Sequence, residues 1–256
     1  MKSLFNSLLL LLAVSFTFSA CDKNDDSPEP GAGQLRINFA HHVDSKALAF
    51  DTIIYKNEAD NEYSITEFKY YISNIKLHNT STGQSYTEAT SYHLVEPKAN
   101  RTSFVLANVP FAVYDEIEFA IGVDSVANAS IDQVGDLDSN NDMAWNWNTG
   151  YIFLKMEGKF RIDSTSVNGY RFHPGADKSF ADRSYIVKRM KLNAPVMIGK
   201  SESYQLNFST NVAEVLRTPN AVDLTTLNNV MFGPKARTIV DNYKDDMITI
   251  NGLSKQ

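Results

Sequence analysis

The stretch Leu35-Arg36-Ile37-Asn38-Phe39 alternates apolar and polar side chains along the chain. In an extended backbone this alternation places Leu35, Ile37 and Phe39 on one side, as in a β-strand that buries one face. Short apolar or alternating runs of the same kind recur through the rest of the sequence, with turn residues between them. The stretch therefore predicts a mostly β fold.

The same pattern predicts a series of further strands. They are expected at Asp51–Tyr55, Tyr63–His78, His93–Val95, Ser103–Leu106, Glu116–Val123, Tyr151–Met156, a short run ending near Ile162, Gly169–Phe172, Ser184–Leu192, Pro195–Ile198, Ser203–Val212 and Met247–Ile250. The Tyr63–His78 run is long enough for two strands, or for a strand after a short helical turn. Short strands at this spacing, with turn signals between them, favour a β-sandwich with an immunoglobulin-like two-sheet architecture.

The end of the chain has a different pattern. Asn211–Leu216 and Leu224–Tyr243 carry helical spacing, which predicts one or two short C-terminal helices. No break in composition divides Gln34–Gln256, so a single domain is expected over residues 34–256.

Residues 1–20 have the layout of a signal peptide. Lys2 supplies a positive charge, Leu8–Phe18 is apolar apart from Ser15 and Thr17, and the small residues Ser19 and Ala20 close the segment. A positively charged start, a short apolar stretch and small residues before the cut are typical of secretory signals. We therefore expect an exported protein.

Cys21, which follows the signal, is the only cysteine of the chain. It excludes an intramolecular disulfide, and Phe18-Ser19-Ala20-Cys21 resembles a bacterial lipobox. The alternative is an ordinary signal peptide followed by a chance cysteine. The lipobox interpretation predicts a lipid anchor at Cys21, with acyl chains such as palmitate, in the outer membrane at its periplasmic face or at the cell surface.

Residues 21–33, which read CDKNDDSPEPGAG, are polar, acidic and rich in Pro and Gly. Such a composition cannot bury apolar area, so the segment is predicted to be a disordered tether. Lys23–Asp26 resembles the acidic signals that direct some lipoproteins to the cell surface, and it is equally typical of a solvated linker.

Net charge and motifs exclude several classes of function. The formal charge is -6, and removal of residues 1–20 takes away only Lys2 and makes it -7. A mildly acidic chain with scattered basic residues has no footprint for nucleic acid. We find no GxSxG, HExxH, phosphate-loop or dinucleotide motif, so we do not expect an enzyme. No protein partner is indicated.

The most distinctive segment is Ile121–Gly158. It contains both tryptophans, Trp145 and Trp147, which would face the same side of a strand because they are two residues apart. The residues before and between them are dense in acidic and amide side chains. Polar loops placed by a rigid sheet are where function concentrates, so this segment is the expected site.

Several motifs in and around this segment resemble the MbnP-like family, which comprises methanobactin-associated copper-binding proteins and related lipoproteins. They are Gly122-Val123-Asp124, Asn128, Gly135–Asp138, Met143–Tyr151 (MAWNWNTGY), Phe153–Gly158 (FLKMEG), Phe39-Ala40-His41, Lys69–Leu77 (KYYISNIKL) and Phe172–Gly175 (FHPG). The resemblance runs over most of residues 34–250.

This resemblance implies a β-sandwich that holds one copper ion. The implied ligands are histidines and a tryptophan oxidised to kynurenine. The matching positions are His173 and either Trp145 or Trp147, with His41 as a further candidate. The sequence departs from the pattern at Leu137–Asp142, where copper-binding members have a histidine and this chain has none.

A calcium site is a second possibility within the same segment. Asp136, Asp138, Asn140 and Asp142 alternate as at the start of a calcium loop. The sixth position is Asn141 instead of Gly, and the twelfth is Trp147 instead of Glu, which excludes an EF-hand. A looser oxygen-ligated site and a capped polar turn both remain open.

The function expected from the sequence is metal binding, copper most plausibly, by an envelope lipoprotein. Two alternatives stay open. One is a surface adhesion or scaffold lipoprotein without metal, which the missing histidine favours. The other is a β module stabilised by calcium.

Overall fold

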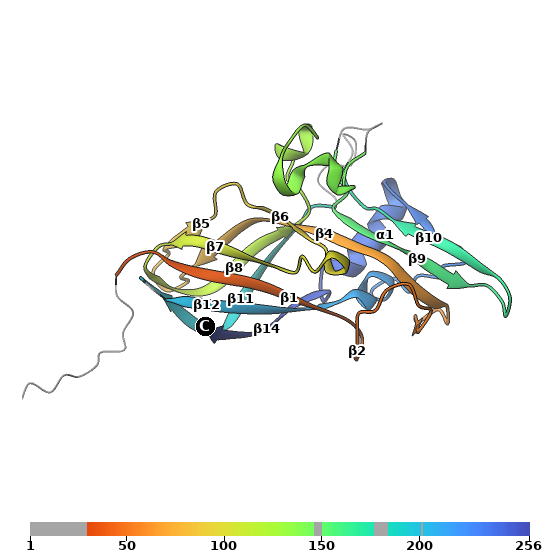
Figure 1. Cartoon of the computed structure of the whole chain (residues 1–256), viewed down its shortest axis with the longest axis horizontal. Helices are drawn as coiled ribbons and strands as arrows, with labels where there is room; N and C mark the ends of the chain where they lie inside the picture. The colour runs from red at the N-terminus through yellow and green to blue at the C-terminus, as the bar shows by residue number, and fades with distance from the viewer. Residues whose placement is uncertain (1–29, 146–149, 177–183, 201) are drawn as a thin grey trace, which may run out of the picture.

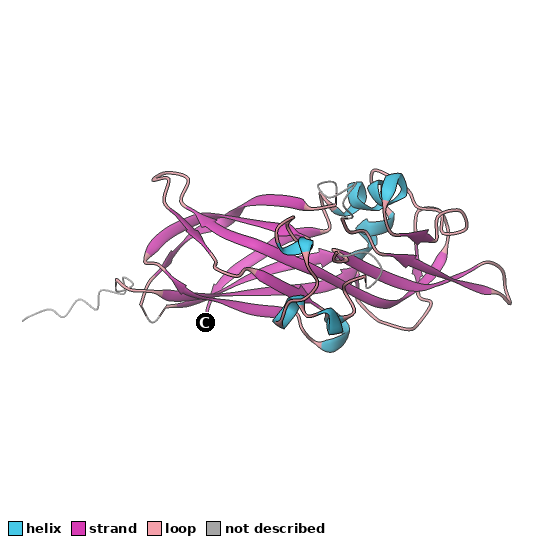
Figure 2. Ribbon diagram, turned by 90° about the horizontal axis from the view of Figure 1, so that it is seen from above, coloured by secondary structure: helices cyan, strands magenta, loops and turns pink. Residues whose placement is uncertain are grey.

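The computed structural model describes residues 30–145, 150–176, 184–200 and 202–256. They form a mostly β domain in which two sheets pack face to face (Figure 1, Figure 2). The predicted β-sandwich is therefore confirmed. Within these ranges no helix is both long enough and apolar enough to cross a membrane.

The first sheet has five strands, in the order β14-β12-β1-β2, with β7 also paired to β1. Their bounds are β1 Gly33–Val43, β2 Lys46–Ala47, β7 Ser103–Val109, β12 Ser203–Asn211 and β14 Ile248–Lys255. The alternating LRINF stretch lies in β1, parallel to β12 and antiparallel to β7. Phe39 lies opposite Phe208 in this register, and their rings stack 5.1 Å apart.

The second sheet has nine strands, in the order β11-β8-β4-β9-β10-β13, with β3, β5 and β6 also paired to β4. Their bounds are β3 Tyr55–Lys56, β4 Glu62–His78, β5 Ser85–Thr87, β6 Tyr92–Val95, β8 Ala112–Ile121, β9 Leu154–Arg161, β10 Val167–Phe172, β11 Ile186–Ile198 and β13 Asn229–Val230. The long strand β4 is the centre of this sheet and runs most of its length.

The main core lies between the two sheets, where their inward side chains meet. Phe39 of β1 contacts Tyr70 of β4 edge to face, and Phe119 of β8 meets Phe208 of β12 in the same way. All four rings are at most 2 % exposed. A smaller apolar cluster lies on the outer face of the nine-stranded sheet, beneath the segment that connects β8 to β9.

The helices are short. Their bounds are η1 Pro97–Ala99, η2 Ala127–Ala129, η3 Gly135–Leu137, η4 Ser139–Asn141, η5 Val212–Leu216 and α1 Gly233–Tyr243, of which only α1 is α-helical. The predicted Leu224–Tyr243 helix is too long at its start, because a turn at Asp223–Leu227 and strand β13 come first. The predicted Asn211–Leu216 helix exists as the 3₁₀ turn η5.

Other boundaries also differ from the prediction. Asp51–Tyr55 is not a strand before Tyr55, because Asp51 adopts the left-handed conformation, at φ 65°. Tyr63–His78 is a single strand, and its length is accommodated by register shifts between Ile65 and Glu67 and between Ser73 and Lys76. The two strands predicted at Ser184–Leu192 and Pro195–Ile198 are the single strand β11 with one irregularity.

Candidate functional site

The two faces of the second sheet differ in chemistry, and strand β4 shows the difference. Phe68 and Tyr70 point to the core between the sheets, whereas Lys69 and Tyr71 point outward, as alternation along a strand requires. The same alternation holds on β9, where Leu154 and Met156 belong to the main core. Residues on opposite faces of this sheet cannot share a small site.

The aromatic part of the outer face surrounds Trp145. Its indole packs edge to face against Phe232 at 4.4 Å, and it belongs to a cluster with Tyr71, Tyr151 and Phe153. Gly175 allows the close approach, because a Cβ there would lie 2.5 Å from the indole Cη2 and 2.3 Å from the Tyr151 carbonyl oxygen. Trp145 is 5 % exposed, so packing is one role of this residue.

His173 lies on the outer face directly after β10. Its backbone N–H donates to the Val230 carbonyl of β13 at 2.8 Å, and its Nε2 is 2.7 Å from Oε1 of Glu157 on β9. This hydrogen bond, working against burial, lowers the pKa of Glu157 and favours its charged form. Because the bond uses Nε2, Nδ1 is the ring nitrogen with which His173 could bind a metal.

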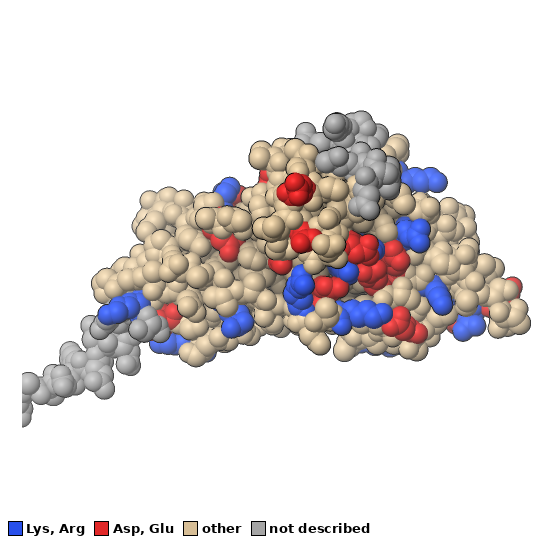
Figure 3. All heavy atoms as spheres, turned by 45° about the horizontal axis from the view of Figure 1, so that its top comes forward, with Lys and Arg blue, Asp and Glu red and all other residues tan. Residues whose placement is uncertain are grey.

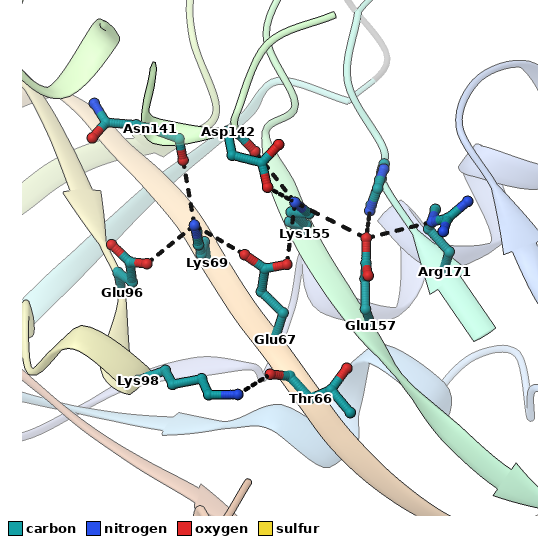
Figure 4. Close-up of polar contacts among 11 residues, drawn as sticks. Thr66, Glu67, Lys69, Glu96, Lys98, Asn141, Asp142, Lys155, Glu157 and Arg171 are labelled. Carbon is teal, nitrogen blue, oxygen red and sulfur yellow. Dashed lines mark hydrogen bonds and ion pairs between the residues drawn. The ribbon is translucent and has the colours of Figure 1, made fainter. Parts of the chain in front are cut away.

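Next to this pair lies a chain of alternating charges that we call the ionic network (Figure 4). Its members are Glu67, Lys69, Glu96, Asp142, Lys155, Glu157 and Arg171. The Lys155 side chain, 5 % exposed, has its ammonium 3.1 Å from Glu67 and 4.0 Å from Glu157, and it also pairs with Asp142. Lys69 pairs with Glu67 at 2.9 Å and Glu96 at 3.1 Å. Burial opposes the charged form of Lys69, but these two hydrogen bonds outweigh it and raise its pKa.

The ionic network follows from the spacing of charges on two neighbouring strands. Glu67 and Lys69 are two residues apart on β4, and Lys155 and Glu157 are two apart on β9, so all four side chains share one face. The register places Glu67 opposite Glu157 and Lys69 opposite Lys155. Like charges directly opposite repel, so each lysine pairs instead with an acid on its own strand or diagonally across.

The structure does not bring His41 to this face. His41 Nε2 is 3.0 Å from the Tyr70 hydroxyl, and its ring lies against Phe68 at 6.1 Å, inside the sandwich. Burial, with a smaller contribution from the neighbouring His42, lowers its pKa to about 3. The prediction that His41 and His173 share one metal is therefore wrong, because the nine-stranded sheet lies between them.

The acidic segment also uses its side chains locally. Asp136 accepts from the Leu94 backbone N–H at 2.8 Å, Asp138 caps η4 by accepting from the Asn140 N–H at 2.8 Å, and Asp142 pairs with Lys155. These contacts are those of a capped polar turn, one of the two interpretations left open by the sequence. Among the described residues, Asp136, Asp138 and Asp142 do not form a group of three acidic side chains that could hold a metal ion.

The donors that the structure describes fit one copper ligand but not the full set that the resemblance implies. Within the described ranges, no group of three or more His, Cys, Asp or Glu side chains converges as a metal site would require. His173 has the carboxylate partner that usually orients a metal-binding imidazole. Trp145 packs beside Gly175, which is two residues after His173 in the chain. Trp147 lies outside the described residues.

Sequence reasoning missed the ionic network and the pairing of His173 with Glu157. The signal was present as Glu67-x-Lys69 and Lys155-x-Glu157, which places two opposite charges on one face of each strand. The strand register that aligns them was not available from the sequence.

The comparisons with known proteins identify the family. A model of the MbnP family matches residues 32–232. Among solved structures, MbnP from Methylosinus trichosporium aligns with a TM-score of 0.49 and 14 % identity, over 88 % of this chain and 99 % of that one. No curated protein matches. The family match spans more than half of the sequence, and this chain is therefore a member of the MbnP family.

Proposed function

We propose that this chain is a lipid-anchored protein of the bacterial cell envelope whose MbnP domain binds a single copper ion at the His173 end of the outer face. The signal peptide and Cys21 support the anchor and an outer-membrane location, at the periplasmic face or the cell surface. Membership of the MbnP family supports the metal. The domain acts as a binding module without catalysis.

The observation that carries the copper proposal is the His173–Glu157 pair, whose histidine lies two residues before Gly175, the glycine on which the Trp145 indole packs. A carboxylate that accepts from one imidazole nitrogen fixes the ring orientation and raises the basicity of the other nitrogen, as at many metal sites. Imidazole suits copper, whereas the carboxylate-rich acidic segment suits hard cations. His173 would hold the ion, and the Trp145–Trp147 segment would supply the neighbouring donors.

Equilibrium dialysis of residues 21–256 against Cu(I), Cu(II) and Zn(II) tests this proposal. We expect about one copper per chain, lost in His173→Ala and retained in His93→Ala. His93 is a matched control, because it too is hydrogen-bonded to a carboxylate, that of Glu88 at 2.8 Å, but lies in β6. Uptake by the wild type that persists in His173→Ala would assign the metal to other residues and refute the proposed site.

One observation favours a second candidate function, an envelope scaffold without metal. The ammonium of Lys155 lies 4.0 Å from Glu157, so a positive charge is already present beside the carboxylate that supports His173. Such a charge repels a metal cation, and the segment before Trp145 lacks a histidine. Under this candidate the wild type takes up no copper and its melting temperature is unchanged by chelator.

Intact mass adds an independent readout. Conversion of a tryptophan to kynurenine adds about four mass units to the peptide that contains Trp145 and Trp147. The gain, in protein purified from its native host, supports the copper proposal. An unmodified mass together with no copper uptake supports the scaffold.

A further inference from the structure

The chain enters the fold at one end of the sandwich, which we call the tether end. Gly31 packs so closely on Lys200 that a Cβ there would lie 2.8 Å from the lysine Cβ. Strand β1 begins at Gly33, opposite Val109 at the end of β7. The turn from β7 to β8 therefore lies close to the point where the anchored segment joins the domain. The chain's C-terminus, after β14, is on the same side of the sandwich (Figure 1).

Two large apolar side chains are exposed at this end. Phe111 is 40 % exposed in the turn between β7 and β8, and Met197 near the end of β11 is 39 % exposed. Met197 lies opposite Val113 in the β8–β11 register, and Phe111 is two residues before Val113, so the two exposed side chains come from neighbouring positions at this end. A hydrogen bond stabilises the turn, because the Tyr114 hydroxyl donates to the Pro110 carbonyl at 3.1 Å.

The acidic groups at the tether end are engaged by neighbours. Glu202 pairs with Lys255 at 2.9 Å, and Asp115 accepts from the Thr80 N–H at 2.8 Å. On the face that Figure 3 shows, basic and acidic side chains are interspersed. Glu202 and Asp115 are thus paired or hydrogen-bonded, so these two groups add little charge that an anionic lipid would repel.

The length of the anchored segment limits which part of the domain can reach a membrane. From Cys21 to Gly31 the chain spans at most roughly 35 Å when fully extended. Strand β4, whose 17 residues extend over roughly 55 Å, runs from the β9–β10 hairpin to the tether end. Glu62 at its start pairs with Arg161, and Asn79, just beyond its end, donates to the Val113 carbonyl. A chain held at Cys21 therefore keeps the tether end within roughly 35 Å of the lipid, whereas the tether sets no such limit for the hairpin tip.

We infer that the tether end rests on the phospholipid surface, with Phe111 and Met197 as its apolar contact. The inference depends on the lipid anchor of the proposed function and is independent of copper. Two side chains bury too little area to bind a membrane from solution. The anchor holds the domain next to the bilayer, which raises the effective concentration of lipid around Phe111 and Met197. A contact that is weak in solution then forms for much of the time. The contact would fix the orientation of the domain and hold the β9–β10 hairpin away from the bilayer.

Quenching of tryptophan fluorescence by brominated lipid tests the contact. Residues 21–256 are coupled through the thiol of Cys21 to maleimide lipid in vesicles of phosphatidylethanolamine, phosphatidylglycerol and brominated phosphatidylcholine. Phe111→Trp and Met197→Trp add an indole at the proposed contact. The matched control Ile162→Trp adds one beyond β9 toward the hairpin tip, where Ile162 is 56 % exposed. The emission of the unsubstituted chain is subtracted from each variant.

We expect most of the added emission to be lost in coupled Phe111→Trp and Met197→Trp, and to be retained in Ile162→Trp and in all uncoupled proteins. Equal quenching at the three positions, or none, overturns the inference. Dimerisation of the uncoupled chain that shields Phe111→Trp assigns the surface to a second copy and also overturns it. Because the coupling is chemical, the result does not depend on whether cells lipidate Cys21, which palmitate labelling of the full chain tests separately.

Discussion

The two faces of the nine-stranded sheet give a histidine different surroundings, aromatic on one side and charged on the other. Against the inner face, His41 of β1 packs on Phe68 and Tyr70, and burial lowers the pKa of His41 to about 3. On the outer face, His173 is hydrogen-bonded to Glu157 at the end of the ionic network. Both residues are histidines, so their different surroundings come from the face of the sheet against which each of them packs. The inner face stabilises the fold, and the outer face is the one equipped for binding.

The largest expected effect tests the structural role of the inner face. Phe68→Ala removes a ring that is 0 % exposed and contacts His41 and Tyr70. We expect the free energy of unfolding to fall by about 3–5 kcal/mol, because the neighbouring strands cannot collapse into the cavity. Urea denaturation of residues 34–256 measures this. A loss below about 1 kcal/mol would mean that the face is less tightly packed than described.

A second, smaller effect is the pH dependence that His41 gives to stability. Its pKa is about 3 in the folded chain, against an ordinary value of 6.5, so between these values the unfolded chain binds the proton and the folded chain does not. Stability from this group is therefore present at pH 7 and falls as the pH is lowered through 6.5. Between pH 7 and pH 5 the expected loss is about 2 kcal/mol.

His41→Gln serves as the comparison, because glutamine keeps a polar group near Tyr70 but does not titrate. Urea denaturation of both proteins at pH 7 and pH 5 should show a loss in the variant that is smaller by about 2 kcal/mol. Identical pH dependence in the two proteins would show that His41 does not cause it.

The smallest expected effect concerns the outer face. Lys155→Met keeps the length of the side chain but removes the ammonium that joins Glu67 to Asp142. Since Glu67 retains Lys69 and Asp142 is largely solvent-exposed, we expect a loss of about 1 kcal/mol. Arg161→Met, on the same strand but in an exposed pair with Glu62, should cost less than about 0.5 kcal/mol.

Differential scanning calorimetry of the two variants separates these outcomes. Equal melting temperatures for Lys155→Met and Arg161→Met would show that the ionic network behaves as ordinary surface charge. A loss in Lys155→Met comparable to that of Phe68→Ala would remove the contrast between the two faces.

The local pattern of apolar and polar residues was sufficient to predict many of the strands. The alternation in Leu35–Phe39 and the apolar runs of β8, β9 and β12 predicted strands that exist, because a half-buried strand needs a period of two whatever its partner is. Boundaries failed where the backbone leaves the extended region for a local reason. Asp51 turns into the left-handed conformation, and Asp223–Leu227 forms a turn inside a predicted helix.

The candidate site was predicted in part. The Trp145 segment and His173 were both selected from the sequence, and they lie on the same face of the same sheet. His41 was selected with them as a further candidate for the ligand set that the family resemblance implies. Alternation along the strand puts His41 on the same face as Ile37 and Phe39, but it could not show that His173 lies on the other side of the nine-stranded sheet.

The sequence by itself determined the chemistry of each strand face, because side-chain alternation is a property of the extended backbone alone. Tertiary structure decided which faces meet. The pairing of β9 with β4 on one side and with β10 on the other joined Lys69, Lys155, Glu157 and His173 into one surface. The packing of β1 over the opposite face of β4 left His41 half-buried against Phe68 and Tyr70. These pairings join residues far apart in the chain, and they are selected by the burial of both sheets together, which no local segment specifies.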